Sequence, residues 1–201
     1  MAKLSFYYGA MGSCKTLRLL TTAYNFEEKG IPFMVLKPSA DTRDGSNIIK
    51  SRIGVERECI PINEDVDIYQ AIKDYNNILK STFSKLEYIL IDECQFLTEN
   101  QVNQLAKIVD KLEINVLCFG LRTDFTSHCF QGSKRLFELA DTIEEVKSRC
   151  DCGNKTSINA RFDSNGKLIL EGNQIVIGGN DIYKPLCRKC WSQEVSKILK
   201  K

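Results

Sequence analysis

The first 121 residues alternate between short apolar runs and longer stretches in which apolar residues recur with helical spacing. The runs at residues 4–8, 31–37, 88–91 and 115–121 are typical of strands buried in a parallel sheet. Residues 17–26, 68–79 and 102–112 each have one apolar face and predict helices. This order predicts an α/β fold with right-handed crossovers and a mostly parallel sheet that carries helices on both faces.

Local signals mark several boundaries. Gly30 is placed to end the first helix, and Thr98 is placed to cap the start of the third. Residues 39–54 are polar, contain turn residues and have no clear period, so they predict a loop. Because ligands of such sheets bind at the carboxyl ends of the strands, we expect this loop to reach over a ligand; an ordinary solvated loop is the alternative.

The sequence GAMGSCKT follows the first strand and precedes the first helix, which is the setting of a phosphate-binding loop. Its backbone N–H groups would point inward at phosphate oxygens, Lys15 would reach the terminal phosphates, and Thr16 would hold Mg²⁺. Nucleotide binding is therefore predicted for Gly9, Ala10, Met11, Gly12, Ser13, Cys14, Lys15 and Thr16.

Cys14 departs from the common pattern GxxxxGK[ST], which has glycine at this position. A Cβ and a sulfur here would crowd the phosphates or strain the backbone. If Cys14 adopts ordinary helical dihedrals, its side chain points away from the nucleotide.

A second nucleotide signature is ILIDECQF, an apolar strand that ends in two carboxylates. Asp92 is placed to order Mg²⁺ and Glu93 to act as a base, with Cys94 and Gln95 assigned to the same site. Alone, the pattern would indicate an ordinary strand end. Combined with the upstream loop, it predicts a magnesium–nucleotide site.

The composition is that of an ordinary globular protein, with 43% hydrophobic residues, 27% charged residues and a net charge of +2. No basic stripe suggests a nucleic-acid partner, no apolar run is long enough to span a bilayer, and the first strand follows Met1 without a signal peptide. We expect a cytoplasmic protein. The only Asn-Lys pair, Asn154 and Lys155, lacks the aspartate of the guanine-specific NKxD segment, so ATP is the expected nucleotide.

Nine cysteines are unevenly distributed along the chain. The odd total of nine in a protein expected to be cytoplasmic argues against a disulfide framework. Five of the cysteines stand singly and are expected to fill apolar space. The other four form a CxC and a CxxC pair: Cys150, Cys152, Cys187 and Cys190. Four thiolates suit tetrahedral Zn²⁺ and predict a structural zinc ribbon; free cysteines and iron–sulfur or redox use are the alternatives.

From Arg149 onward, glycines and paired cysteines replace the helical periodicity and indicate a second, smaller unit. We expect an ATP-binding α/β domain at residues 1–148, a zinc-ribbon domain at residues 149–191 and a C-terminal tail at residues 192–201. The segment from Trp191 onward is predicted as a short helix.

Taken together, the phosphate loop, DECQF, GLRTDF, the cysteine pairs and VIGGNDIY resemble the type II thymidine kinases, which are zinc-containing deoxynucleoside kinases. The resemblance covers nearly the whole chain, in order. It implies a P-loop (RecA-like) α/β fold with a zinc-ribbon domain that carries a lasso loop, a homotetramer, and feedback inhibition by dTTP. The implied reaction transfers the γ-phosphoryl of ATP to the 5′-hydroxyl of thymidine, giving dTMP and ADP in deoxynucleotide salvage, with deoxyuridine as a second substrate.

The resemblance also implies roles for individual residues. Glu93 would take the proton of the 5′-hydroxyl, while Lys15 and Arg43 would offset charge on the transferring phosphoryl group. An aromatic residue under the base corresponds to Phe125, for which a core phenylalanine is the alternative. The full set of implied substrate contacts is Asp41, Phe96, Leu121, Phe125, Val176, Ile177, Gly178, Gly179 and Tyr183.

Two other functions remain open. DECQ also resembles a helicase motif, as in a nucleic-acid-dependent P-loop ATPase with a zinc ribbon, although this chain has room for only one ATPase lobe. The second of these functions is a non-enzymatic zinc-ribbon interaction module in which Cys14 prevents the loop from binding phosphate.

Overall fold

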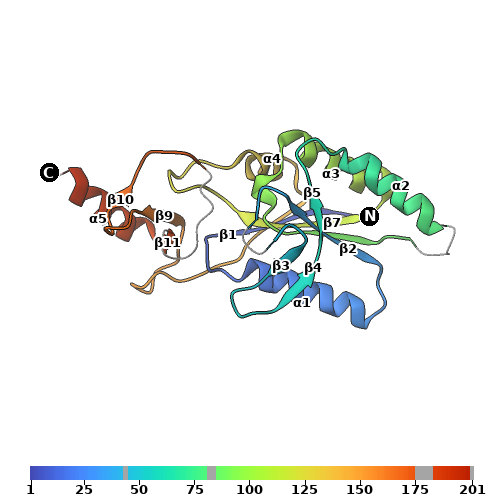
Figure 1. Ribbon diagram of the computed structural model, residues 1–201, viewed down its shortest axis with the longest axis horizontal. Coiled ribbons are helices and arrows are strands. Elements are labelled where there is room, and N and C mark those ends of the chain that lie inside the picture. The colour runs from blue at the N-terminus through green and yellow to red at the C-terminus, as the bar shows by residue number, and fades with distance from the viewer. Residues whose placement is uncertain (43–44, 81–84, 175–182, 200–201) are drawn as a thin grey trace.

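The computed structural model describes residues 1–42, 45–80, 85–174 and 183–199 (Figure 1). Its main sheet has the strand order β5-β2-β6-β7-β1-β8, and every neighbouring pair within it is parallel. The strands are β1 (Leu4–Gly9), β2 (Phe33–Pro38), β5 (Ile60–Ile62), β6 (Tyr88–Ile91), β7 (Asn115–Leu121) and β8 (Thr142–Glu145). This confirms the predicted parallel sheet.

Helices cover both faces of this sheet, as predicted. In Figure 1, α1 (Lys15–Glu28) lies on one side of the sheet, and α2 (Ile68–Lys80), α3 (Glu99–Leu112) and α4 (Gln131–Leu139) lie on the other. Two apolar cores result, because each face of the sheet is closed by its own helices. Leu19, Leu90 and Phe119 belong to the core under α1, whereas Phe6, Ile89 and Leu105 belong to the core under α2 to α4.

The predicted cap of α3 is present. The Thr98 hydroxyl accepts a hydrogen bond from the Gln101 N–H at 3.1 Å, and the Gln101 side chain accepts one from the Thr98 N–H at 3.1 Å. These reciprocal bonds satisfy two N–H groups that would otherwise lack partners at the helix start.

The prediction that residues 39–54 form a loop was wrong in part. β3 (Ile48–Lys50) forms an antiparallel hairpin with β4 (Glu56–Glu58), and Ile49 is buried in the core under α1. Three-residue strands are too short to produce a readable alternation. The helix α4 and the strand β8 were also not predicted.

The second unit contains a three-stranded antiparallel sheet of β9 (Ile158–Phe162), β10 (Leu168–Ile169) and β11 (Tyr183–Leu186), with β9 in the centre. The predicted C-terminal helix is α5 (Arg188–Leu199), which begins before Trp191. Trp191, Val195 and Ile198 pack on a small apolar cluster that includes Cys150 and Cys187. Most of this tail segment is therefore structurally continuous with the cysteine-containing unit.

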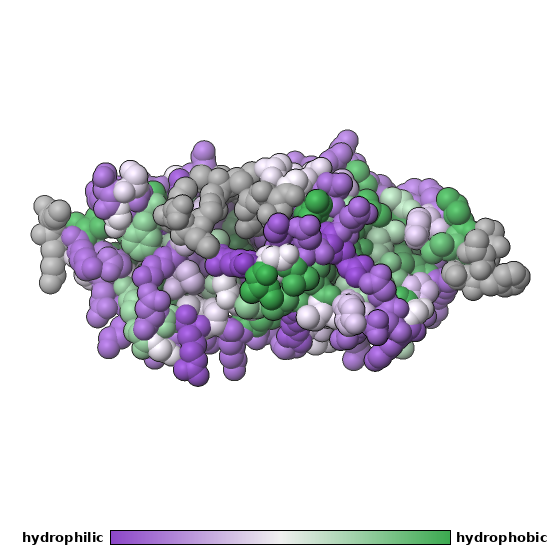
Figure 2. All heavy atoms as spheres, turned by 60° about the horizontal axis from the view of Figure 1, so that its bottom comes forward, coloured by the Kyte–Doolittle hydropathy of each residue, from purple (hydrophilic) through white to green (hydrophobic). Residues whose placement is uncertain are grey.

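Hydrophilic side chains cover much of the face seen in Figure 2, and a small patch of hydrophobic side chains lies near its centre. Exposed apolar side chains include Ile53 and Val55 in the turn between β3 and β4. Across the described ranges, no helix combines the length and apolar character needed to cross a lipid bilayer.

Candidate active site

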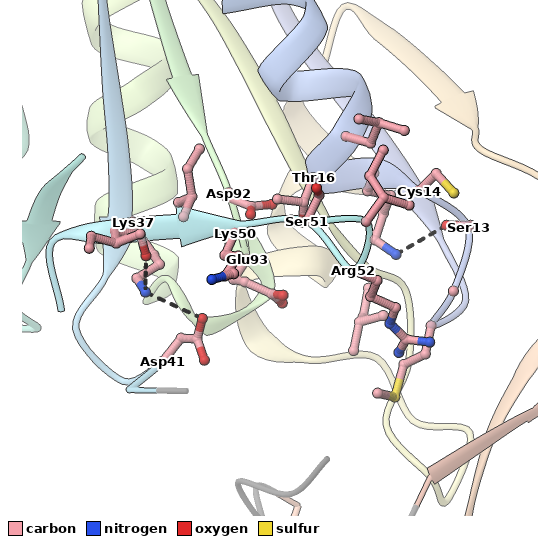
Figure 3. A pocket seen from close by; sticks show the side chains of 18 residues that line it. Ser13, Cys14, Thr16, Lys37, Asp41, Lys50, Ser51, Arg52, Asp92 and Glu93 are labelled. Carbon is pink, nitrogen blue, oxygen red and sulfur yellow. Dashed lines mark hydrogen bonds and ion pairs between the residues drawn. The ribbon is translucent and has the colours of Figure 1, made fainter. Parts of the chain in front are cut away.

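A cavity of about 390 Å³ lies at the carboxyl ends of the central strands (Figure 3). The phosphate loop and the start of α1 form one wall, the acidic turn after β6 forms another, and β3 with the start of its following turn forms a third. This is where a parallel sheet is expected to bind its ligand. β7 lies between β1 and β6, so the two nucleotide motifs are on strands that are not direct neighbours.

The phosphate loop wraps around its own lysine. Lys15 is buried, and its Nζ donates hydrogen bonds to the Ala10 carbonyl at 2.9 Å, to Ser13 Oγ at 3.1 Å and to the Gly9 carbonyl at 3.4 Å. Burial lowers the pKa of Lys15, whereas the charges of Glu93 and then Asp92 act in the opposite direction. The ammonium group is therefore stabilised by the two acids that face the loop.

Glycine is the only residue type that fits at position 9, the start of the loop. A Cβ at this position would lie 2.4 Å from the Val146 carbonyl oxygen and 2.5 Å from Ser13 Oγ. The backbone of the loop thus packs directly on the chain after β8, which leaves its other side toward the cavity.

Cys14 does not have the helical dihedrals considered above. Its φ of 61° and ψ of 28° place it in the left-handed region, at the N-cap of α1. The position therefore requires the conformation that glycine adopts without cost, and the cysteine strains the backbone. The side chain is exposed, and in Figure 3 its sulfur points away from Asp92 and Glu93.

The two carboxylates after β6 have different environments. Asp92 is buried, and burial followed by the charge of Glu93 raises its pKa to about 7, while a hydrogen bond from the Thr16 side chain acts against this rise. The Thr16 hydroxyl and the Asp92 carboxylate are thus neighbours, as expected for two groups that hold one Mg²⁺. Glu93 has a left-handed backbone, with φ 49° and ψ 36°, and lines the cavity.

The turn that follows Glu93 is a short 3₁₀ helix, η1 (Cys94–Phe96), and it is tightly packed. A Cβ on Gly120 of β7 would lie 2.6 Å from both Cys94 Sγ and Gln95 Oε1, and a Cβ on Gly132 of α4 would lie 2.7 Å from the Cys94 carbonyl oxygen. Two glycines therefore let β7 and α4 approach the turn closely. Cys94 and Gln95 are buried and are not among the residues that line the cavity. Their contact with the nucleotide stays a prediction.

The four paired cysteines converge at the far end of the molecule. Their sulfur atoms all lie within 4.8 Å of one another, and Cys152 Sγ is 3.5 Å from Cys187 Sγ. A hydrogen bond from the Asn154 backbone is the main cause that lowers the pKa of Cys152 to about 6. Four thiolates at this spacing fit a tetrahedral metal with bonds of about 2.3 Å, as Zn²⁺ prefers.

The match to known proteins agrees with this geometry. The family model for thymidine kinase matches residues 2–191. The chain belongs to the thymidine kinase family. It is 44% identical over 190 residues to a thymidine kinase of Streptococcus agalactiae serotype Ia, covering 94% of this chain and 96% of the relative.

Other members of the thymidine kinase family are similarly close. A thymidine kinase of Vibrio vulnificus is 42% identical over 197 residues, covering 98% of this chain and all of the relative. Among solved structures, the Pif1 helicase from Candida albicans aligns with a TM-score of 0.42 and 15% identity, over 73% of this chain and 36% of the helicase. Neither the family model nor these kinases favour the alternative of a nucleic-acid-dependent ATPase.

The structure places the residues that family resemblance assigns to substrate in different surroundings. Asp41 and Leu121 line the cavity, whereas Phe96 packs edge-on against Phe130 with ring centres 5.8 Å apart. Phe125 is only 1% exposed. Tyr183 is half-buried at the start of β11, and Arg43, Val176, Ile177, Gly178 and Gly179 lie outside the described residues.

Several cations at the cavity were missed by the sequence analysis. Lys37, at the end of β2, is 1% exposed; its Nζ donates to the carbonyls of Gly45 at 2.7 Å and Ile48 at 2.8 Å, and it lies 3.6 Å from Asp41. A lysine within an apolar strand run was a usable signal, because buried lysines almost always have partners. Lys50 and Arg52 enter the cavity only through the unpredicted hairpin.

Proposed function

We propose that this protein transfers the γ-phosphoryl group of ATP to the 5′-hydroxyl of thymidine, giving dTMP and ADP. The observation that carries the proposal is the meeting of Lys15, Asp92 and Glu93 in one cavity, in a chain of the thymidine kinase family. Phosphoryl transfer requires positioning and charge neutralisation, and this cavity supplies both a phosphate cradle and a base.

On the donor side, the open N–H groups of the loop and the N-terminus of α1 would bind the phosphates of ATP. The Lys15 ammonium would release its loop carbonyls and move to the terminal phosphates. Thr16 and Asp92 would hold Mg²⁺, which when bound supplies positive charge at the phosphates. Arg52 lies 3.5 Å from where a Cβ on Gly12 would stand, so its guanidinium is positioned to add charge on the same side.

On the acceptor side, Glu93 would accept the proton of the 5′-hydroxyl as the oxygen attacks. Asp41, held near the buried Lys37, lies on the side of the cavity away from Ser13 and Cys14 in Figure 3, and in sequence it borders the segment that contains Arg43. We assign Arg43 to the charge of the transferring group. Leu121, Phe125 and Phe96 would shape the base pocket, with Phe96 and Phe125 acting from behind its lining.

The described residues directly before the predicted lasso are tied to this region. Gln174 donates from its side-chain amide to Asp124 Oδ2 at 2.7 Å, and the guanidinium of Arg161 lies 5.0 Å from the centre of the Phe125 ring. Arg161 also donates to the Asn173 carbonyl at 3.2 Å. These contacts support a role for Val176, Ile177, Gly178, Gly179 and Tyr183 in gripping the base.

The four-cysteine cluster would hold a structural Zn²⁺. We further expect a cytoplasmic homotetramer that acts in deoxynucleotide salvage and is inhibited by dTTP. The α/β domain of residues 1–148 would bind ATP, and the unit at residues 149–191 would close over the nucleoside.

The test is coupled ADP release with ATP, Mg²⁺ and a panel of nucleosides. We expect turnover with thymidine, weaker turnover with deoxyuridine, and none with purine nucleosides. Loss of the thymine methyl costs about 1 to 3 kcal/mol in an apolar pocket, which sets the preference over deoxyuridine at about 10- to 200-fold. ADP release that needs DNA or RNA and ignores thymidine would refute the proposal.

A further inference from the structure

Asn159 joins the second unit to the phosphate loop. It lies in β9, the central strand of the small sheet, and is 3% exposed. Its Oδ1 accepts a hydrogen bond from the Met11 N–H at 2.8 Å, and its Nδ2 donates to the Thr123 carbonyl at 3.0 Å. Both ends of one buried amide are therefore used to hold two segments of the first unit.

These two segments belong to the nucleotide cavity and the predicted base pocket. Met11 is part of the phosphate loop, and its N–H is already bound by Asn159 rather than open to a phosphate, contrary to the expectation of successive inward amides. Thr123 lies between Leu121 and Phe125. A neighbouring bond, from Arg122 Nη2 to the Ser157 carbonyl at 3.0 Å, reinforces the same junction.

The position of Asn159 depends in turn on the four-cysteine cluster. Asn159 stands opposite Pro185 of β11, and the Ser157 N–H donates to the Leu186 carbonyl at 3.0 Å, directly before Cys187. The next residue of β9, Ala160, is fully buried in the apolar cluster with Cys150 and Cys187. Figure 1 shows β9 and β11 beyond the end of β1, where the loop begins.

The loop has little internal structure of its own to fix its shape. Among the backbone hydrogen bonds of the described residues, the one from the Ser13 N–H to the Ala10 carbonyl, at 3.3 Å, closes the loop. The hydrogen bonds from Lys15 to Gly9, Ala10 and Ser13 must break when the lysine turns toward a phosphate. The Met11–Asn159 bond does not involve the lysine and can persist. A hydrogen bond from outside the loop keeps the loop ordered before ATP binds, so that less conformational entropy of the loop is lost on binding.

We propose that Asn159 is a positioning residue through which the four-cysteine unit fixes the phosphate loop, so that ATP affinity depends on a side chain that does not line the nucleotide cavity. The inference rests on the proposed use of ATP. It assigns the second unit a part in binding the phosphate donor, in addition to its predicted part in binding the nucleoside.

The test compares Asn159→Ala and Asn159→Leu with the wild type in the full-length protein. We measure the Kd for Mg–ATP by calorimetry, the KM values for ATP and thymidine, and the zinc content. Both variants should raise the ATP Kd and KM about tenfold, as expected for the loss of the buried Met11–Asn159 hydrogen bond at the loop. The thymidine KM should rise by a smaller factor, because the variants also lose the Thr123 bond beside the predicted base pocket.

Two control variants separate this effect from general loosening. Asn165→Ala removes an exposed asparagine in the turn after β9 and should change none of these values. Leu105→Ala removes a buried side chain from the core under α2 to α4, outside the second unit, and should lower the Tm without a selective rise in the ATP KM.

The outcomes are distinct. A wild type that binds no ATP overturns the proposed function and this inference together. If the wild type binds ATP but both Asn159 variants bind it equally well, or if the ATP and thymidine KM values rise by one common factor, only the positioning role of Asn159 is overturned.

Discussion

Gln95 holds the carboxylate of Glu93 in place. Its Nε2 donates to Glu93 Oε2 at 2.5 Å, while its Oε1 accepts the N–H of Leu121 at 2.9 Å. The base proposed for the reaction is thereby linked to the end of β7, the strand next to β1 and its phosphate loop. The left-handed backbone of Glu93 places this carboxylate at the cavity, and the amide fixes its direction.

Replacing this amide should misplace the base without removing it. Gln95→Leu should lower kcat about tenfold with little change in the ATP KM, because the carboxylate loses the Gln95 hydrogen bond that orients it. The unsatisfied Leu121 N–H should also cost about 1 to 3 kcal/mol of stability. Gln104→Leu is the control: Gln104 accepts the Ile68 N–H at 2.8 Å and neither residue lines the cavity, so its loss should reduce stability but not kcat. Equal kcat losses in the two variants would contradict a positioning role for Gln95.

Glu93 itself is tested by the isosteric change Glu93→Gln. If the carboxylate accepts the 5′-hydroxyl proton, kcat for thymidine should fall about 10²- to 10⁴-fold while the ATP Kd stays near that of the wild type. Single-turnover rates of dTMP formation give the chemical step directly. Glu28→Gln, at an exposed position at the end of α1, should be neutral. Undiminished turnover in Glu93→Gln would remove this residue as the base.

Cys14→Gly should relieve the backbone strain at the N-cap of α1. A non-glycine residue in the left-handed region costs about 1 kcal/mol or more, so the glycine variant should have a free energy of unfolding about 1 kcal/mol higher, with an ATP KM that is similar or lower. Cys14→Ala is the matched control, since it removes the sulfur but keeps the Cβ, and should not be stabilised. Chemical denaturation without nucleotide measures both. If alanine stabilises as much as glycine, the strain is not in the backbone.

Asp92 makes the stability of the nucleotide-free protein depend on pH. Because its pKa is raised to about 7 in the folded state, the folded protein binds this proton more tightly than the unfolded chain. The contribution is present in acid and is lost as the pH rises through about 7. In Asp92→Asn the side chain does not titrate, so this pH-dependent loss of stability is absent.

The free energy of unfolding of the wild type should therefore fall relative to Asp92→Asn by about 3 kcal/mol between about pH 5 and about pH 8. Denaturation curves at several pH values, without Mg²⁺ or nucleotide, measure the difference. A difference that is independent of pH would show that Asp92 has an ordinary pKa.

The cysteine cluster should release about one equivalent of Zn²⁺ per chain when its thiols are modified. Cys187→Ser should lose this zinc and alter the fluorescence of Trp191, the only tryptophan, which packs on the cluster. Cys129→Ser, at an exposed thiol outside the cluster, should keep both. Full zinc content in Cys187→Ser would argue against a four-thiolate site.

Much of the fold was predictable because its signals are local. Buried strands such as β6 and β7 are nearly continuous apolar runs. The cap of α3 is formed by two residues three positions apart, Thr98 and Gln101. The β3–β4 hairpin was not predictable, since its strands are three residues long and its order comes from contacts with α1 and from the Lys37 bonds to the loop before it. Arg52 and Lys50 were missed for that reason.

The sequence by itself determined the parallel α/β core, the phosphate loop, the acidic strand end and the four-cysteine set, because each is carried by residue types at fixed spacing. Only the tertiary structure decided that Cys14 is left-handed, that Gln95 turns inward to hold Glu93, and that Asn159 binds Met11 across 148 positions of the chain. Such relationships depend on which surfaces meet after folding. The partners of a buried amide cannot be read from the spacing of residues in the sequence. They are decided in the folded structure, where nearly every buried polar group must form a hydrogen bond.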